Sequence, residues 1–163
     1  MGYGMTLETL VVGVGPKDNT RTAELTRAIR EIAEPAGASV VLLHVFTEKA
    51  YEEGIEEAGF EDDEPPSATE LAERLEGIDV IGAALAEAEI RHEIRGAIGS
   101  EGETILEETD AVDGDLLYIS GRKRSPTGKA VFGSTSHRIM MNSSCPVVFV
   151  REDVYGADGD DAE

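Results

Sequence analysis

The chain has 163 residues, close to the length of one domain. Its 34 acidic residues outnumber the 14 basic ones and give a formal charge of −20, while hydrophobic residues make up 40% and aromatic residues 5%. This balance argues against nucleic acid as a partner, and no apolar run approaches the roughly 20 residues of a membrane span. A single cysteine, Cys145, excludes an internal disulfide framework. We therefore expect one cytoplasmic domain that binds neither nucleic acid nor membrane.

The acidic excess is typical of proteins that work at high salt. Only four of the basic residues are lysines. A net charge of this size destabilises a compact chain by self-repulsion, and salt screens that repulsion. The composition therefore favours a cytoplasm rich in salt. An ordinary protein with an acidic surface and tail is the alternative.

The first part of the domain alternates strand and helix. The apolar run 10–14 is followed by Gly15-Pro16, which is typical of a buried strand and a loop. Apolar residues at helical spacing then predict a helix, capped by Asn19 or Thr20 and ended by Pro35 and Gly37. The continuous β-branched run 39–46 predicts a second strand that is covered on both faces.

Residues 47–66 interrupt this pattern with nine acids against one lysine. We interpret them as a solvated surface insertion, in loop or short helix. Ser67 and Glu70 form a capping box, and the apolar stripe from Leu71 to Leu85 predicts one helix behind it. The elements that follow are a strand near 90–96, a helix 100–112 with a second capping box at Ser100 and Glu103, a strand 115–120, a loop 121–133, a helix 134–142 and a strand 145–150.

Strands that alternate with helices predict an α/β fold with one open, twisted, five-stranded parallel sheet, Rossmann-like, with helices on both faces. We expect the domain to span residues 9–151, with an extension at 1–8 and an acidic disordered tail at 152–163. Such sheets bind ligands at the carboxyl ends of the strands, where strand order reverses. The loops after the first and fourth strands are therefore the candidate site.

The loop after the fourth strand opens a basic segment. From Gly121 to Arg151 the chain holds six basic residues and no acid, so the other 132 residues carry −26. Glycines allow close backbone approach, and a helix that starts at Gly133-Ser134 would present N–H groups to an anion. The segment predicts a phosphate or nucleotide cradle. The basic side chains involved are Arg122, Lys123, Arg124 and Lys129.

A structural role for the same segment stays open. Ser134 can act as a helix cap only, and the basic residues can balance the acidic surface within the chain or across a dimer. The segment is neither a Walker A loop nor a G-x-G-x-x-G motif.

The C-terminal third, DLLYISGR followed by GSTSHRIMMNSSCPVVFV, together with the strand VVLLHVF, resembles the universal stress protein family. The resemblance covers residues 7–151. It implies a five-stranded parallel domain that is usually a homodimer through its final strands. One branch of the family binds ATP and another does not, so the cofactor expected for this chain is ATP with Mg²⁺ or none. The strand that would meet its copy here consists of Val147, Val148, Phe149 and Val150.

The resemblance also implies a nucleotide motif, which this chain matches in part. ATP-binding members carry Gly, two residues, Gly, nine residues, Gly and then Ser or Thr. Arg124 stands at the second glycine, and eight residues separate it from the Gly-Ser pair. An Asp usually follows the first strand, where this chain has Gly15, with Asp18 three residues later. The site residues implied are Gly15, Val45 against the adenine, Gly121, Arg122, Lys123, Arg124, Gly128 for flexibility, Lys129, Gly133, Ser134 and Thr135.

The remaining reactive residues carry little chemistry. We expect His44 to be a strand-end residue with a satisfied hydrogen bond, His137 to lie on a helix surface and His92 to be exposed. Cys145 is interpreted as a small buried hydrophobe, and neither a nucleophile with a base nor metal spacing is identifiable.

Three functions stay open. The first is a non-catalytic ATP-binding stress-response module with at most slow, incidental ATPase activity. The second is a dimeric interaction protein that binds no nucleotide. The third is an enzyme on this fold, for which Asp18 is the only nearby carboxylate that the sequence offers.

Overall fold

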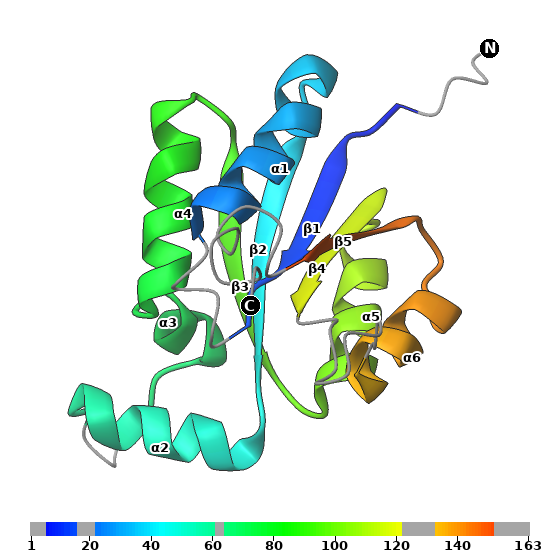
Figure 1. The fold of residues 1–163 in the computed structure, drawn as a ribbon. Coiled ribbons are helices and arrows are strands. Elements are labelled where there is room, and N and C mark those ends of the chain that lie inside the picture. Colours follow the sequence, from blue (N-terminus) through cyan, green and yellow to red (C-terminus); the bar gives the residue numbers. More distant parts are fainter. Residues whose placement is uncertain (1–5, 16–21, 61–63, 122–132, 152–163) are drawn as a thin grey trace, which may run out of the picture.

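The computed structural model describes residues 6–15, 22–60, 64–121 and 133–151 (Figure 1). The strands are β1 (Thr9–Gly13), β2 (Ser39–Phe46), β3 (His92–Ile98), β4 (Leu116–Gly121) and β5 (Val147–Arg151). The helices are α1 (Thr22–Ala36), α2 (Glu48–Ala58), α3 (Ala68–Ala72), α4 (Glu76–Glu87), α5 (Glu101–Ala111) and α6 (Ser134–Asn142). None of the helices in these ranges is long and apolar enough to cross a membrane.

The five strands form one parallel sheet in the order β3-β2-β1-β4-β5. Helices α1 and α4 cover one face, and α5 and α6 cover the other (Figure 1). The predicted α/β fold is thus confirmed. The chain builds outward from β1 through β2 to β3, then returns to place β4 on the other side of β1. The order therefore reverses between β1 and β4, where a parallel sheet opens a crevice for ligands.

Each inner strand feeds two cores because its side chains alternate between the faces. Leu10 and Val12 of β1 pack under α1 and α4, whereas Val11 between them packs toward α5 and α6. All three are at most 1% exposed. The near-continuous apolar runs of the inner strands follow from this double coverage.

The single helix predicted behind Ser67 is wrong: the chain forms α3 and α4, separated at Leu75. The capping box itself is present, since Ser67 Oγ accepts from Glu70 N at 3.0 Å and Ser67 N donates to Glu70 Oε1 at 2.9 Å. Leu75 is extended, with φ −74° and ψ 134°. Because of this break, the two helices pack against different elements of the fold. Helix α3 packs on the edge strand β3, and α4 packs beside α1.

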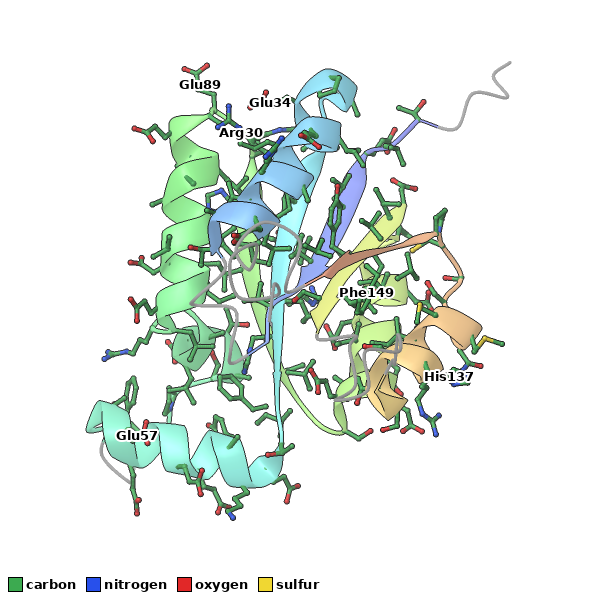
Figure 2. All side chains as sticks on the ribbon, viewed as in Figure 1. Arg30, Glu34, Glu57, Glu89, His137 and Phe149 are labelled. Carbon is green, nitrogen blue, oxygen red and sulfur yellow. The ribbon has the colours of Figure 1, made fainter. Side chains whose placement is uncertain are left out.

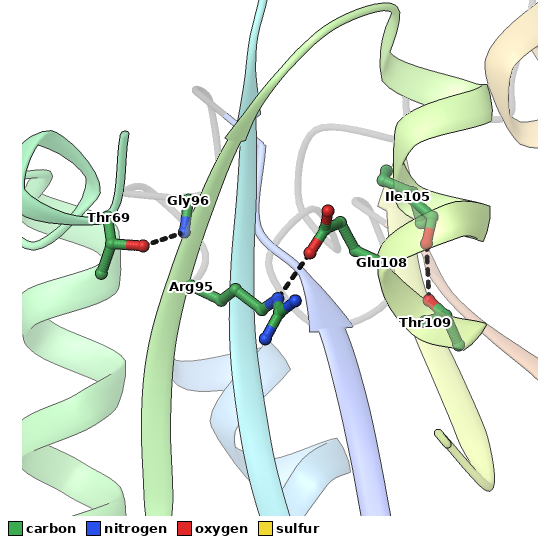
Figure 3. A network of polar contacts seen from close by, with 6 residues as sticks. All are labelled: Thr69, Arg95, Gly96, Ile105, Glu108 and Thr109. Carbon is green, nitrogen blue, oxygen red and sulfur yellow. Dashed lines mark hydrogen bonds and ion pairs between the residues drawn. The ribbon is translucent and has the colours of Figure 1, made fainter. Parts of the chain in front are cut away.

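The contact between α3 and β3 is very close (Figure 3). The backbone N–H of Gly96 donates to Thr69 Oγ1 at 3.0 Å, so a side-chain oxygen of α3 satisfies a donor of the edge strand. A neighbouring ion pair joins Arg95 Nε to Glu108 Oε1 of α5 at 2.5 Å. Edge strands expose unpaired backbone groups that invite association. Helix α3 therefore protects part of this edge, and β5 forms the opposite edge of the described sheet.

Helix α2 forms within the acidic insertion. Thr47 Oγ1 accepts from Ala50 N at 3.0 Å, and Gly59, at φ +79°, ends the helix in the left-handed conformation that glycine tolerates best. No residue of α2 is fully buried, which agrees with a solvated helix. Tyr51 holds it to the domain: its ring packs on Phe46 and its hydroxyl donates to Pro66 O.

Two local expectations are corrected. The second capping box is absent, because Ser100 makes no side-chain bond to the helix backbone and its hydroxyl points to Glu103 Oε1 at 3.4 Å. His92 is half-buried rather than exposed. The reason is Gly82 of α4, whose missing side chain leaves room for the imidazole: a Cβ there would lie 3.2 Å from His92 Nε2.

The buried hydroxyl of Tyr118 couples stability to pH. It donates to Ala28 O at 2.9 Å, and burial, helped by the charge of Glu31, raises the pKa of Tyr118 from 10.0 to about 12. An unfolded tyrosine loses its proton near pH 10, whereas the folded one keeps it. The contribution of the protonated Tyr118 hydroxyl to the free energy of unfolding is therefore complete below pH 10 and is lost as the pH rises toward 12.

We expect an absorbance titration to show one tyrosine ionising near pH 12, and Tyr118→Phe to remove that step. Chemical denaturation gives the free energy of unfolding at pH 9 and at pH 11. Between these two pH values it should fall less in Tyr118→Phe than in the unmodified protein. A Tyr118 that titrates near its ordinary value of 10.0 would contradict the prediction.

Candidate functional site

A cavity of about 200 Å³ lies at the reversal of strand order, on the face of the sheet that α5 and α6 cover. It opens where β1 and β4 end and where α5 and α6 begin. The residues that line it are Gly13, Gly15, Glu101, Ile105, Ile119, Ser120, Thr135, Ser136 and Ile139. The candidate crevice predicted after the first and fourth strands is therefore present.

The walls of the cavity combine glycine backbone, hydroxyl groups, apolar side chains and one acidic residue, Glu101. Gly13 ends β1 and Gly15 follows two residues later, and both bring backbone to the edge of the cavity without side chains. Ser120 of β4 and Thr135 and Ser136 of α6 contribute hydroxyl groups. Three isoleucines close the inner wall and keep it apolar. Hydroxyls and backbone N–H groups beside an apolar wall suit a small polar ligand that carries negative charge.

The start of α6 is built to leave backbone donors available. Its N-cap is Gly133, at φ −66° and ψ 169°, and no side chain caps the helix. Thr47 and Ser67 occupy nearly the same backbone conformation at the N-caps of α2 and α3, and both use their hydroxyl to accept an N–H of the first turn. Glycine at this position gives up that capping bond. The first turn of α6, with Thr135 and Ser136, thus faces the cavity as an uncapped helix start.

The structure places the sequence-predicted site residues in three groups. Gly15 and Thr135 line the cavity. Gly121 ends β4 directly after Ser120, and Gly133 and Ser134 are exposed at the start of α6. Val45 is half-buried in β2 on the same face of the sheet and does not line the cavity. The basic residues Arg122, Lys123, Arg124 and Lys129, together with Gly128 and Asp18, lie outside the described residues.

Four polar or backbone positions of the cavity were missed from the sequence. Gly13 lies two residues before the predicted Gly15, and Ser120 lies one residue before the predicted Gly121. The sequence therefore indicated the carboxyl ends of β1 and β4, but it placed the site residues one or two positions too far along the chain. Ser136 lies two residues after Ser134 in the same helix turn. Glu101 had no signal of its own, because it reaches the cavity only through the packing of α5 against α6.

The other candidate residues have structural roles. His44 is buried, and its Nδ1 donates to Val14 O at 2.6 Å, which confirms a satisfied strand-end histidine. His137 is exposed on α6 (Figure 2), as predicted. Cys145 is half-buried against the second core, and burial raises the pKa of its thiol. Asp115 ties down the chain ahead of β1, since its Oδ2 accepts from Glu8 N at 2.9 Å and Thr9 N at 3.0 Å.

A wider groove, about 470 Å³, runs between α1 and α4 on the opposite face. Its charged residues form pairs along α1. Arg27 Nε lies 3.3 Å from Glu31 Oε2. Arg30 Nε lies 2.6 Å from Glu34 Oε2, and Figure 2 labels these two residues. The groove does not include the carboxyl end of any strand. Its greater volume therefore does not make it the better candidate for the site of a parallel α/β sheet.

Comparison with known proteins gives the family. The model of the universal stress protein family matches residues 6–151. A universal stress protein of Mycolicibacterium smegmatis is 33% identical over 72 residues, which cover 44% of this chain. The match spans about half, 55%, of that relative's own length.

Solved structures share the fold. A universal stress protein from Archaeoglobus fulgidus superposes with a TM-score of 0.65 at 24% identity, over 88% of this chain and 98% of its own. Another from the same organism, in complex with dAMP, gives 0.59 at 18% over 90% and 99%. A family protein from Arabidopsis thaliana with AMP bound gives 0.62 at 16% over 96% and 99%. With the family model covering nearly the whole described fold, the chain belongs to the universal stress protein family.

Proposed function

We propose that this protein is a stress-response module that binds an adenine nucleotide, ATP with Mg²⁺, in the cavity between β1, β4, α5 and α6, without a dedicated catalytic reaction. The observation that carries the proposal is the position of the cavity. It lies at the reversal of strand order and joins glycine backbone, hydroxyl groups and the uncapped start of α6. Anions bind well where glycines and a helix start meet.

In this proposal the nucleotide contacts two surfaces. Gly121, Gly133, Ser134 and Thr135 follow β4 and open α6, where phosphates would meet N–H and hydroxyl donors. Gly15 would face the sugar, and Val45 on the neighbouring strand would offer an apolar contact to the base. The family relatives with bound dAMP and AMP support this class of ligand. The basic residues Arg122, Lys123, Arg124 and Lys129, with Gly128 between them, would neutralise the phosphates.

The side chains of the cavity support binding rather than catalysis. No histidine or cysteine is among the described residues that line it. His44 shares the face of β2 with Val40 and Leu42, on the side of the sheet that α1 and α4 cover, and its Nδ1 donates to Val14 O. We therefore take the hydroxyls of the cavity as binding groups, because neither of the residue types that most often activate or act as a nucleophile stands beside them in the described lining. Hydrolysis would then be slow and incidental.

Calorimetric titration tests the nucleotide proposal. ATP with MgCl₂ and AMP are titrated in molar KCl, because the charge of −20 points to a high-salt cytoplasm. We expect micromolar to millimolar affinity for ATP, and Thr135→Val to lower it about tenfold by removing a hydroxyl from the cavity.

The matched control is Thr26→Val, which makes the same change in the groove between α1 and α4 and should leave the affinity unchanged. A folded protein that takes up neither nucleotide at millimolar concentration would overturn the proposal. If the two variants lowered the affinity for the nucleotide equally, the nucleotide would not bind in this cavity.

A second function is favoured by the exposed edge of the sheet. Strand β5 pairs only with β4 among the described strands, and Val147, Val148 and Phe149 are half-buried there. An apolar edge strand favours pairing with another copy. We therefore propose a homodimer through β5, Val150 included, which as an interaction protein would need no nucleotide. Light scattering in molar KCl should give twice the chain mass of 17.4 kDa, and a monomer mass would exclude this dimer.

A further inference from the structure

The two glycines at the edge of the cavity flank a residue that is held at three points. Gly13 and Gly15 line the cavity, and Val14 lies between them. The side chain of Val14 packs in the core under α1 and α4, on the opposite face of the sheet, and is 4% exposed. Its N–H donates to Leu43 O at 2.8 Å, and its carbonyl oxygen accepts from His44 Nδ1 at 2.6 Å. Val14 is therefore the fixed point of this short segment.

The bond from His44 attaches β1 to β2 beyond the end of their pairing. The paired residues of the two strands end at Gly13 and Leu43, and the carbonyl of the next residue, Val14, receives its donor from a side chain of β2. A carbonyl oxygen only accepts, so His44 Nδ1 carries the proton in this bond. The imidazole is 7% exposed, and its ring meets that of Phe46 edge to face, with the ring centroids 4.5 Å apart. The donor is therefore held in direction as well as in distance.

We propose that His44 is a positioning residue of the nucleotide site, which holds the backbone of Gly13 and Gly15 in place through Val14. The inference rests on the proposed function. His44 is not among the described residues that line the cavity, so it acts through the chain and not on the ligand. Glycine adopts many backbone conformations, and the two glycines therefore depend on Val14 for their position. A backbone that is already in place loses less conformational entropy when the ligand binds.

Two variants of similar shape isolate the hydrogen bond. Asparagine and leucine branch at the same atom and both lack the ring. The amide nitrogen of asparagine stands where the imidazole has Nδ1 and can donate to Val14 O, whereas leucine has no donor. Calorimetric titration with ATP and MgCl₂ in molar KCl should give an affinity about tenfold lower for His44→Leu than for His44→Asn. His44→Asn should bind ATP within about threefold of the unmodified protein, and it tests the inference by itself if His44→Leu does not fold.

Hydrogen exchange tests the route through Val14 without a ligand. The N–H of Val14 is bonded to Leu43 O, so its exchange reports how often the end of β1 opens. We expect this N–H to exchange about tenfold faster in His44→Leu than in His44→Asn, because only the asparagine keeps a donor on the carbonyl of the same residue. Exchange is measured by nuclear magnetic resonance, and thermal unfolding reports whether each variant is folded.

Tyr118→Phe is the matched control. It also removes a side-chain donor from a backbone carbonyl on the face under α1 and α4, since the Tyr118 hydroxyl donates to Ala28 O at 2.9 Å. That bond attaches β4 to α1 and does not involve the segment between the two cavity glycines. This variant should bind ATP as the unmodified protein does.

The outcomes separate the two proposals. If the unmodified protein binds ATP and the two His44 variants bind it equally, the role of His44 is overturned and the proposed function stands. A difference in affinity without a difference in the exchange of Val14 also overturns the inference, as does a loss in Tyr118→Phe as large as that in His44→Leu. If the unmodified protein binds neither ATP nor AMP, the proposed function fails and this inference fails with it.

Discussion

Gly96→Ala is expected to lower the free energy of unfolding by about 3 kcal/mol, at the upper end of the usual cost of overpacking. A Cβ at this position would lie 2.2 Å from Ala68 O and 2.4 Å from Ala68 C, both atoms of the backbone. Neither atom can rotate away, so α3 must move off the edge of the sheet. The bond from Gly96 N to Thr69 Oγ1 would be lost in the same movement (Figure 3).

Guanidinium denaturation followed by circular dichroism measures this loss. Gly13→Ala is the matched control, since it also adds a methyl group to a strand glycine, but the nearest atom, Ile105 Cδ1, would lie at an ordinary contact distance of 3.5 Å. The control should change stability far less than Gly96→Ala. Equal losses in the two variants would show that α3 adapts to the added methyl group and that the contact is not rigid.

Gly133→Ser is expected to weaken nucleotide binding about tenfold while leaving the fold as stable as before or slightly more stable. The backbone at Gly133 already has the conformation in which Thr47 and Ser67 cap their helices, and nothing lies within 4 Å of a Cβ there. The new hydroxyl would accept an N–H in the first turn of α6. That donor would then be unavailable to a phosphate.

Gly133→Ala separates the hydroxyl from the added carbon, because it offers no acceptor to the helix. We expect the alanine variant to bind ATP more tightly than the serine variant in calorimetry, and thermal unfolding to rank the serine variant as the more stable of the two. Serine and alanine variants that both bind like the unmodified protein would mean that the N–H groups of this turn do not contact the ligand.

Much of the fold was accessible from the sequence, because its periodicities are strong. The run 39–46 and the segment 134–142 coincide with β2 and α6 as observed. The inner strands are apolar throughout since helices cover both faces, and this alternation of strand and helix leaves few topologies open. His44 and the Ser67 capping box also followed from local patterns, since their partners lie at a neighbouring strand end or within one helical turn.

The predictions from the sequence were wrong where contacts between distant segments determine the local structure. The break at Leu75 exists because α3 must reach the edge of β3 while α4 lies along α1, and neither contact is visible in the stripe of apolar residues. His92 is half-buried because Gly82 leaves it space from another helix. Ser100 and Glu103 have the spacing of a capping box, yet Glu103 pairs with Arg138 of α6 instead of the backbone ahead of its own helix.

For the site, the sequence by itself determined the edge of the sheet, the glycines after β1 and the Gly-Ser start of α6, because these are fixed by residue type and chain order. Only the tertiary structure decided which side chains meet in the cavity. Ser120, Ser136 and Glu101 come together from β4, α6 and α5. These residues come together because of how α5 and α6 pack against each other and against the sheet. That packing depends on the volumes of all the side chains on this face, so no local sequence pattern predicts it.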